Sequence, residues 1–186
     1  MATALGTALV ALTGCTSSNA QSSDDQGETK QAEAAVIRLA ERHAAPRIAG
    51  ADLEGRHTAL ADFQGKIVVV NVWGSWCSPC RAEAAVLEEI HREMWPRGVR
   101  FLGINTRDRQ TKAARSFEQT YGLTFPSLYD PSGRLLMQFP ADILNPQAIP
   151  STLVVDRRGR IAASVSGPMT VSGLRSMITR VLEEGT

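Results

Sequence analysis

Apolar residues along the chain follow two periods, one typical of buried strands and the other of amphipathic helices. Residues 67–73, IVVVNVW, form a nearly continuous run of β-branched side chains and predict a strand that is buried on both faces of a sheet. Residues 81–95 are rich in Ala, Leu and Glu and predict a helix, which Pro96 and Gly98 end before a second buried strand at 99–105. The three segments together predict a βαβ unit.

The same periods predict further elements on both sides of this unit. In chain order they are a leading helix over 31–45, a hairpin over 48–60, a helix over 109–121, a strand over 125–128, one or two helical turns over 134–139, a hairpin over 151–166 and an amphipathic helix over 171–184. This order of helices and strands predicts one α/β domain over 46–186, with the leading helix before it.

The first thirty residues differ in composition from the rest of the chain. An apolar run ends at Leu12-Thr13-Gly14-Cys15, which resembles a bacterial lipobox, so a signal peptide is expected over 1–14 and a lipid on Cys15. The run is too short to span a bilayer, and a buried N-terminal helix is the alternative. Residues 15–30 are small and polar and predict a flexible tether, which would hold an extracytoplasmic domain at the cell membrane.

Composition narrows the function classes before any motif is considered. The 186 residues are 43% hydrophobic and 21% charged with a net charge of +1, which argues against a disordered chain and against a strongly basic nucleic-acid-binding protein. Lipidation of Cys15 would leave Cys77 and Cys80 as a pair among the three cysteines. A disulfide between them closes a very small loop and would stabilise the fold little, which favours redox chemistry over a structural role.

The two cysteines are expected where the buried strand ends and the next helix begins. The unpaired amides and the positive end of that helix favour a thiolate at Cys77, whereas Cys80 lies one turn further in and deeper. This asymmetry suits thiol–disulfide exchange, in which an exposed thiolate attacks a substrate disulfide and a second thiol resolves the mixed disulfide. Cys77 is therefore the expected nucleophile and Cys80 the expected resolving thiol.

Two motifs and their order resemble the thioredoxin fold. They are Trp76-Cys77-Ser78-Pro79-Cys80 at the strand-to-helix junction and, far downstream, Ile149-Pro150-Ser151-Thr152 before a hairpin and a final helix. Three further features are similar to the TlpA/ResA branch of membrane-tethered thiol-disulfide oxidoreductases. They are the helix and strand inserted at 109–128, the lipobox and the sequence Trp73-Gly74-Ser75-Trp76-Cys77. The resemblance covers roughly residues 46–184. It implies a thioredoxin-like α/β fold, a central mixed sheet flanked by helices with an N-terminal β-hairpin.

The resemblance also implies a client-binding surface and its partners. Pro150 would be a cis proline that faces the dithiol, a rare form of the peptide bond. Ile149, Pro79 and Trp76 would complete the surface that contacts an extended client segment. The implied partners are client protein disulfides, apocytochrome c among them, and a membrane thiol-electron carrier. The resemblance suggests no cofactor and no metal.

A carboxylate interrupts the apolar face of the helix expected at 81–95. That face is formed, at helical spacing, by Cys80, Glu83, Ala84, Leu87, Ile90 and Met94. Burial would raise the pKa of Glu83 and suit it to exchange protons with Cys80, and the ResA-like family implies an active-site acid at this position. The alternative is a glutamate at the edge of the face whose carboxylate reaches water. Asn71 stands where thioredoxins carry a buried aspartate, and an amide cannot relay protons, so that role is either absent here or taken over by Glu83. Asn71 would otherwise be a hydrogen-bonded residue of the core.

Other functions of this fold stay open from the residues alone. A copper-binding metallochaperone typically has three residues between its cysteines and a later histidine, whereas no histidine follows His91, which is expected on the solvated side of its helix. A thiol peroxidase would need a different environment around its cysteine than Ser75-Trp76-Cys77 supplies. The dipeptide Ser78-Pro79 is closer to the Gly-Pro of thioredoxins than to the histidine-containing pairs of strong oxidants, which favours a reductase of client disulfides.

Overall fold

The central sheet has six strands in the spatial order β1-β8-β7-β4-β5-β6 in the part of the chain that the structure, a computed structural model, describes, residues 1–2 and 35–184. The strands are β1 (Ala35–Val36), β4 (Ile67–Trp73), β5 (Val99–Thr106), β6 (Ser127–Asp130), β7 (Ser151–Val155) and β8 (Ile161–Ser166). β4, β5 and β6 run parallel, whereas β7 is antiparallel to β4, and β8 is antiparallel to β7. The sheet is therefore mixed, as the sequence predicts.

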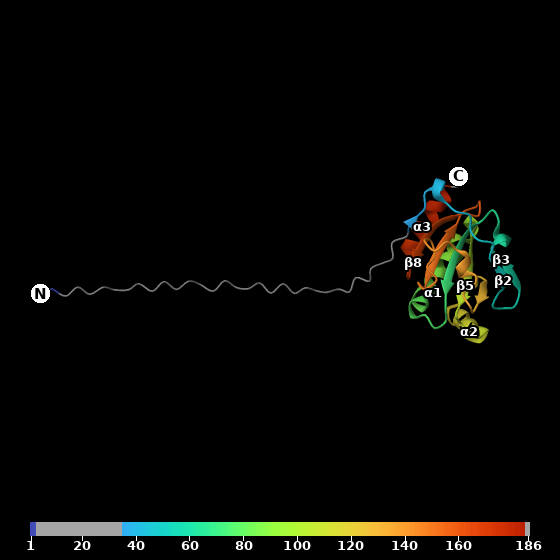
Figure 1. Cartoon of the computed structure of the whole chain (residues 1–186), viewed down its shortest axis with the longest axis horizontal. Helices are drawn as coiled ribbons and strands as arrows, with labels where there is room; N and C mark the ends of the chain where they lie inside the picture. The colour runs from blue at the N-terminus through green and yellow to red at the C-terminus, as the bar shows by residue number, and fades with distance from the viewer. Residues whose placement is uncertain (3–34, 185–186) are drawn as a thin grey trace.

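Helices and a small hairpin surround this sheet (Figure 1). The helices are α1 (Ser78–Met94), α2 (Thr111–Tyr121) and α3 (Val171–Glu183), with short 3₁₀ helices η1 (Leu39–Glu41), η2 (Leu60–Phe63), η3 (Trp95–Arg97) and η4 (Leu136–Gln138). The hairpin consists of β2 (Ala49–Ala51) and β3 (His57–Ala59) and lies on the side of the domain away from β8. Each helix and strand that the sequence predicts within residues 46–184 is confirmed, with bounds that differ by a few residues. The leading helix predicted before this range is not.

Alternate side chains of β4 point to opposite faces of the sheet and pack in two different clusters. Val69 packs in one cluster with apolar residues of α1 and α3. Val68 packs on the opposite face with η4 and the segment that precedes β7. Because side chains alternate along a strand, Asn71 and Trp73 lie on the same face as Val69, the face that the helices cover. The polar and aromatic side chains at the end of β4 are thus directed toward α1 and α2.

The leading helix expected over 31–45 is not found in the described part of that segment. Ala35 and Val36 pair with the edge of β8, and η1 follows as a single turn. The Ile37 amide donates to the Ala162 carbonyl at 2.8 Å, and the Ile161 amide donates to the His43 carbonyl at 2.9 Å. The prediction is wrong over 35–45 because these backbone groups cover an otherwise unpaired sheet edge, which outweighs a helical period made mostly of small alanines.

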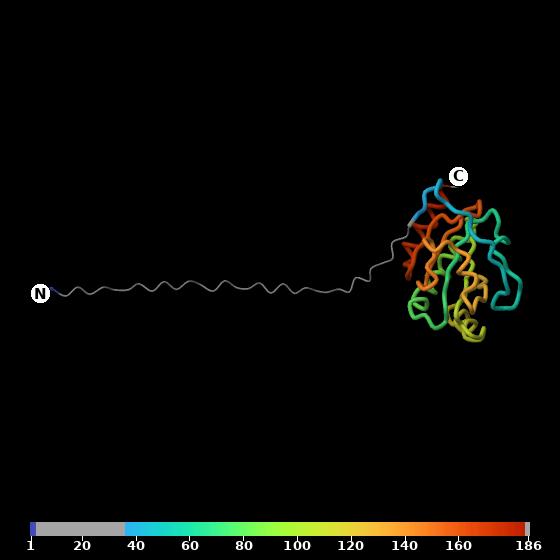
Figure 2. The backbone as a smooth tube through the Cα atoms, in the orientation of Figure 1, coloured from blue at the N-terminus to red at the C-terminus, as the bar shows by residue number. Residues whose placement is uncertain are grey.

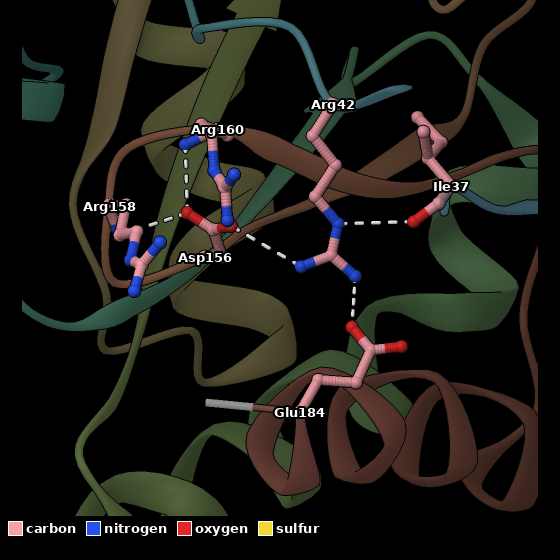
Figure 3. Close-up of polar contacts among 6 residues, drawn as sticks. All are labelled: Ile37, Arg42, Asp156, Arg158, Arg160 and Glu184. Atoms are coloured by element: carbon pink, nitrogen blue, oxygen red, sulfur yellow. Dashed lines mark hydrogen bonds and ion pairs between the residues drawn. The ribbon is translucent and has the colours of Figure 1, made fainter. Parts of the chain in front are cut away.

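This N-terminal segment lies beside the end of α3 (Figures 1 and 2), where the buried Arg42 holds it. The side chain of Arg42 is 1% exposed, and its guanidinium donates to the Ile37 carbonyl at 3.1 Å and to Asp156 at 3.3 Å. It also pairs with Glu184 at the end of α3, so one cation joins three segments (Figure 3). Asp156 lies in the turn between β7 and β8, where Arg160 also pairs with it.

The expectations for the N-terminal thirty residues fall on a part of the chain that is not described. The signal peptide over 1–14, except Met1 and Ala2, the lipidated Cys15 and the tether over 15–30 lie outside the described residues. Within the described ranges, no helix is both long and apolar enough to cross a bilayer.

Candidate active site

The two cysteines form a disulfide at the N-terminus of α1. Cys77 is the N-cap residue of this helix, and its Cα lies 5.3 Å from that of Cys80. The Cys80 amide donates to Cys77 Sγ at 3.2 Å, so an unpaired amide of the first turn points at this sulfur. Pro79 occupies the first turn, where a proline removes no helical hydrogen bond. The strand-to-helix junction and the pair are as the sequence predicts.

The disulfide is more deeply buried than thiol–disulfide exchange led us to expect. Cys77 is 3% exposed and Cys80 is 1% exposed, so the expected exposure of the attacking sulfur is not found in the oxidised state. Both sulfurs belong to an apolar cluster with Trp73 from β4 and Phe117 from α2. The rings of these two residues stack with centroids 4.5 Å apart, and they place α2 against the base of the disulfide.

The segment before β7 faces this disulfide. The peptide bond between Ile149 and Pro150 is cis, as the resemblance to thioredoxins implies. The Ile149 carbonyl oxygen lies 3.7 Å from Cys77 Sγ, although the two residues are 72 positions apart in the chain. The Pro150 carbonyl accepts a hydrogen bond from the Gly167 amide at 2.8 Å, which ties the segment to the end of β8.

An exposed tryptophan stands next to the disulfide. Trp76 is 47% exposed, and its indole N–H donates to the Thr106 carbonyl at 3.2 Å. The ring folds back over Gly74, where a Cβ atom would come within 2.5 Å of the indole nitrogen. Glycine at position 74 therefore permits this orientation, which leaves an apolar surface beside Cys77. Pro79 is also exposed at this end of α1.

Glu83 is buried on the face of α1 that carries Cys80, so the alternative of a water-exposed carboxylate is excluded. It is 1% exposed, Oε1 accepts from Asn71 Nδ2 at 2.9 Å, and Oε2 accepts from the Met169 amide at 3.1 Å. Burial raises the pKa of Glu83 to about 7, although the hydrogen bonds from Asn71 and Met169 act in the opposite direction. A carboxyl group with this pKa can gain or lose a proton near neutral pH.

Two neighbouring residues that were not predicted from the sequence hold the two segments beside the disulfide: Asp108 holds the loop before Cys77 and Arg107 the segment before the cis proline. The Asp108 carboxylate is buried and accepts from the Ser75 amide at 2.9 Å, from the Ser75 hydroxyl at 2.5 Å and from Asn105 Nδ2 at 2.7 Å. Arg107, which precedes it, donates from Nη2 to the Pro146 carbonyl at 2.7 Å. The available signal was topological, because both residues follow β5, and the carboxyl ends of parallel β4 and β5 meet at one sheet edge.

The histidine expected on the solvated side of α1 is instead buried. The His91 ring packs edge-on against Phe101 and Phe125, with centroids 5.2 and 5.4 Å away. Burial lowers the pKa of His91 below its ordinary value, opposed by the charge of Glu88. His91 thus belongs to the core under α1, at the end of the helix away from the disulfide. Among the described residues, no three His, Cys, Asp or Glu side chains are grouped so that they could hold a metal ion.

Comparisons with known proteins agree with this site. Residues 42–164 match the model of the AhpC/TSA family. The thiol-disulfide oxidoreductase ResA of Geobacillus thermodenitrificans is 30% identical over 137 residues, which are 74% of this chain and 75% of the relative. ResA of Bacillus subtilis is 28% identical over 134 residues, 72% of each chain.

Two solved structures share the fold and about a third of the aligned residues. A DsbF homologue from Corynebacterium diphtheriae is 34% identical with a TM-score of 0.71, over 79% of this chain and 92% of that one. A secreted thiol-disulfide isomerase from Corynebacterium glutamicum is 32% identical with a TM-score of 0.73, over 81% and 92% of the two chains. Since the family match spans both the disulfide and the cis proline, the chain belongs to the AhpC/TSA family and is a ResA-like thiol-disulfide oxidoreductase with a thioredoxin-like fold.

Proposed function

We propose that this oxidoreductase reduces disulfides of client proteins outside the cytoplasm. The observation that carries the proposal is the Cys77–Cys80 disulfide at the start of α1, with the cis bond of Pro150 directly opposite. In this arrangement the backbone at Ile149 and the exposed ring of Trp76 border the sulfur of Cys77. An extended client segment that lies between them brings its own disulfide to that sulfur.

The reaction consists of two exchanges between sulfur atoms. The Cys77 thiolate attacks one sulfur of the client disulfide, a mixed disulfide forms, and the other client sulfur leaves as a thiolate. The Cys80 thiolate then attacks Cys77 Sγ, which closes the intramolecular disulfide and releases the second client sulfur. The client gains two electrons and two protons, and the oxidised chain regains two electrons from the dithiol of a membrane carrier. The Cys80 amide, which donates to Cys77 Sγ, stabilises negative charge on the attacking sulfur.

Glu83 supplies proton exchange near the resolving sulfur. It lies three residues after Cys80 on the same face of α1, and its pKa of about 7 lets it hold a proton in one half of the cycle and release it in the other. The proton of the Cys80 thiol passes to the Glu83 carboxylate as Cys80 becomes the nucleophile. Asn71 cannot take this role, because an amide does not exchange protons near neutral pH.

Membrane attachment and the client complete the proposal. The lipobox-like sequence that ends at Cys15 supports a lipid anchor on the outer side of the cell membrane, with residues 15–30 as the tether. The reducing direction is supported by Ser78-Pro79 between the cysteines. Apocytochrome c is the proposed client, since two cysteines in such a client must be reduced before haem is attached. Intact cytochrome c maturation in a deletion strain would contradict this client.

A redox titration tests the direction of electron flow. The Cys77/Cys80 pair is equilibrated with dithiothreitol and glutathione buffers, and the fraction oxidised is measured by trapping the free thiols. A reductase requires a potential well below about −200 mV, whereas a value near about −120 mV, typical of periplasmic oxidants, would overturn the reducing direction. Cys80→Ser should trap the client as a mixed disulfide on Cys77, and Cys77→Ser should not. Rapid consumption of peroxide by the reduced chain would indicate a thiol peroxidase instead.

A further inference from the structure

Two exposed arginines are held against the loops that border the disulfide. Arg81, in the first turn of α1, donates from Nη2 to the Ser75 carbonyl at 3.0 Å. Arg107 donates from Nη2 to the Pro146 carbonyl at 2.7 Å and to Gln147 Oε1 at 3.1 Å, and its guanidinium lies 6.0 Å from the centre of the Trp76 ring. One arginine is thus attached to the loop before Cys77 and the other to the segment before the cis proline.

Neither arginine has a carboxylate partner in the described part of the chain. Within residues 35–184, no ion pair involves Arg81 or Arg107, whereas other arginines such as Arg160 and Arg175 are paired with acids. Asp108, the acid next to Arg107 in the chain, is directed inward and accepts hydrogen bonds from Ser75 and Asn105. The two guanidiniums therefore lie at the client side of the site without an ion-pair partner among the described residues.

The backbone of Arg107 is in a conformation that favours this placement. Its φ is 59°, and it is the one non-glycine residue with positive φ in the described part of the chain. L-amino acids with large side chains rarely adopt this left-handed region, and such outliers cluster at ligand-binding and catalytic sites. Here the conformation turns Arg107 outward over Trp76, while the next residue, Asp108, points into the core.

A shallow, open cavity at the surface adjoins Arg81. It has a volume of about 330 Å³ and lies between the first turn of α1 and α2, with walls that include Ser75, Arg81, Ser116, Phe117, Thr120 and Tyr121. None of its lining residues is acidic, and one of them is an arginine. The Ser75 and Thr120 hydroxyls already donate to Asp108 and to the Ser116 carbonyl, which leaves the hydroxyls of Ser116 and Tyr121 as further donors. Phe117 also contacts the apolar cluster of the disulfide, so the cavity begins one side chain away from Cys77 and Cys80. A short side chain with a carboxylate can pair here with the Arg81 guanidinium and accept hydrogen bonds from Ser116 and Tyr121.

We propose that Arg81 with this cavity, and Arg107 beside Trp76, form a carboxylate-binding rim that selects client segments with Asp or Glu next to the reactive disulfide. The proposal deepens the reductase function proposed above and rests on it. Exposed charge pairs are individually weak, so the rim is expected to change the rate by a modest factor and to act mainly on encounter and binding. Its effect should decrease as salt screens the charges.

Three peptides of one sequence test the rim. Each carries one intramolecular disulfide, and the residues that flank its cysteines are Asp in the first peptide, Asn in the second and Lys in the third. The full chain is reduced with dithiothreitol, freed of it, and mixed with each peptide, and the second-order rate constant of peptide reduction is measured. At about 20 mM salt, the Asp peptide should react about three- to tenfold faster than the Lys peptide, and this ratio should approach one at about 0.5 M salt.

Arginine variants locate the effect. The double variant Arg81→Gln/Arg107→Gln should lose most of the ratio between the Asp and Lys peptides, and Arg107→Lys should retain it because the positive charge remains. The matched control is Arg97→Gln, which removes one exposed positive charge at the other end of α1 and should keep the wild-type ratio. A loss of rate that is equal for all three peptides in the double variant would indicate a structural role and overturn the rim.

The outcomes separate the rim from the function on which it rests. Equal rates for the three peptides with the wild-type chain, or an unchanged ratio in the double variant, would overturn the rim and leave the reductase function standing. If the reduced wild-type chain reduces none of the peptides, the proposed reductase function itself is overturned. A ratio that depends on Arg81 and Arg107 and on salt supports both.

Discussion

Asn71 donates a hydrogen bond of 2.9 Å from its amide nitrogen to Oε1 of Glu83, across the interface between β4 and α1. The same nitrogen donates to Thr152 Oγ1 at 3.0 Å, and Asn71 Oδ1 has no partner among the described residues. If the amide turns over, Oδ1 can accept from a protonated Glu83 and from the Thr152 hydroxyl. Asn71 is therefore able to partner Glu83 in both protonation states, whereas an aspartate would repel the ionised carboxylate.

Replacement of Glu83 by glutamine should change how stability depends on pH. The pKa of Glu83 is raised from 4.5 to about 7, so the folded chain binds this proton more tightly than the unfolded chain. The protonated carboxyl group therefore adds to the free energy of unfolding. This contribution, roughly 3 kcal/mol, is complete below about pH 4.5 and is lost as the pH rises through about 7. Relative to Glu83→Gln, the free energy of unfolding of the oxidised wild type should fall by up to this amount between about pH 4.5 and pH 8.

Urea unfolding at several pH values measures this difference. The control is Glu89→Gln, which changes an exposed glutamate on the same helix and should keep the wild-type dependence on pH. If the free energies of unfolding of wild type and Glu83→Gln differ by a constant amount across this pH range, Glu83 does not titrate there. The reduction rate of a client peptide by the same variants, followed against pH, then tests the proton-exchange role separately.

Replacement of Asn71 by leucine should raise the pKa of Glu83 above about 7. The hydrogen bond from Asn71 lowers this pKa, and a leucine, which has the same branched shape, leaves Oε1 buried without that donor. The loss of stability should be about 1–3 kcal/mol at a pH where Glu83 is ionised and smaller where it is protonated. The titration is followed directly by the carboxyl ¹³C signal of Glu83.

The matched variant for Asn71→Leu is Thr152→Val. It removes the hydroxyl partner of Asn71 on β7 and leaves the donor to Glu83 in place, so the pKa of Glu83 should change little. If Asn71→Leu and Thr152→Val shift the carboxyl titration equally, the bond between Asn71 and Glu83 is not what controls the acid.

The apolar periods of the sequence predicted the site best where the position of a residue on a strand or helix determines its burial. The run of β-branched residues in β4 and the apolar face of α1 predicted the junction that carries Cys77 and Cys80. The position of Glu83 on that face predicted its burial, because a helix fixes which residues share a side. These features are local, so neighbouring residues in the chain are enough to infer them.

Features that depend on distant partners were missed or wrongly predicted. The segment 35–45 has a weak helical period, but the unpaired edge of β8, more than a hundred residues away, determines its conformation. His91 was placed on the solvated side of α1, yet the aromatic rings of Phe101 and Phe125 cover it. Asp108 has no local signal, since its hydrogen bonds to Ser75 arise only when β4 and β5 pair.

Replacement of Asp108 by alanine should loosen the loop that carries Trp76. The variant removes both hydrogen bonds to Ser75 and leaves the Ser75 amide without an acceptor, at an expected loss of about 1–3 kcal/mol in the free energy of unfolding. The rate of client reduction should fall as well, because Trp76 borders the sulfur that reacts. Tryptophan fluorescence, the rate of client reduction and the free energy of unfolding are measured on the same samples.

Two variants control for Asp108→Ala. Asp108→Asn keeps one oxygen that can accept from the Ser75 amide and should give intermediate losses. Asp142→Asn removes one negative charge from an exposed position and should leave stability and rate close to wild type. If Asp108→Ala reduces client disulfides at the wild-type rate, Asp108 does not position the loop.

Replacement of Arg42 by methionine should be the most damaging change away from the dithiol. The variant removes a buried cation that joins Ile37, Asp156 and Glu184 (Figure 3). Breaking a buried ion pair commonly costs about 3–5 kcal/mol, and a value of about 3 kcal/mol is expected here because Arg160 still pairs with Asp156.

The loss of stability in Arg42→Met should become smaller as the pH falls. Burial alone would raise the pKa of Asp156, but hydrogen bonds from Arg160, Arg158 and Arg42 together hold it below its ordinary value of 3.8. The resulting stability is complete above that value and is lost as the pH falls through the lower pKa of the folded state. The difference in the free energy of unfolding between wild type and Arg42→Met should therefore be largest near neutral pH and should narrow as the pH falls below 3.8. The control is Arg38→Met, which breaks an exposed ion pair with Glu41 and should lower the free energy of unfolding by at most about 1 kcal/mol. An equal loss of stability in the two variants would show that burial of the Arg42 cation adds nothing.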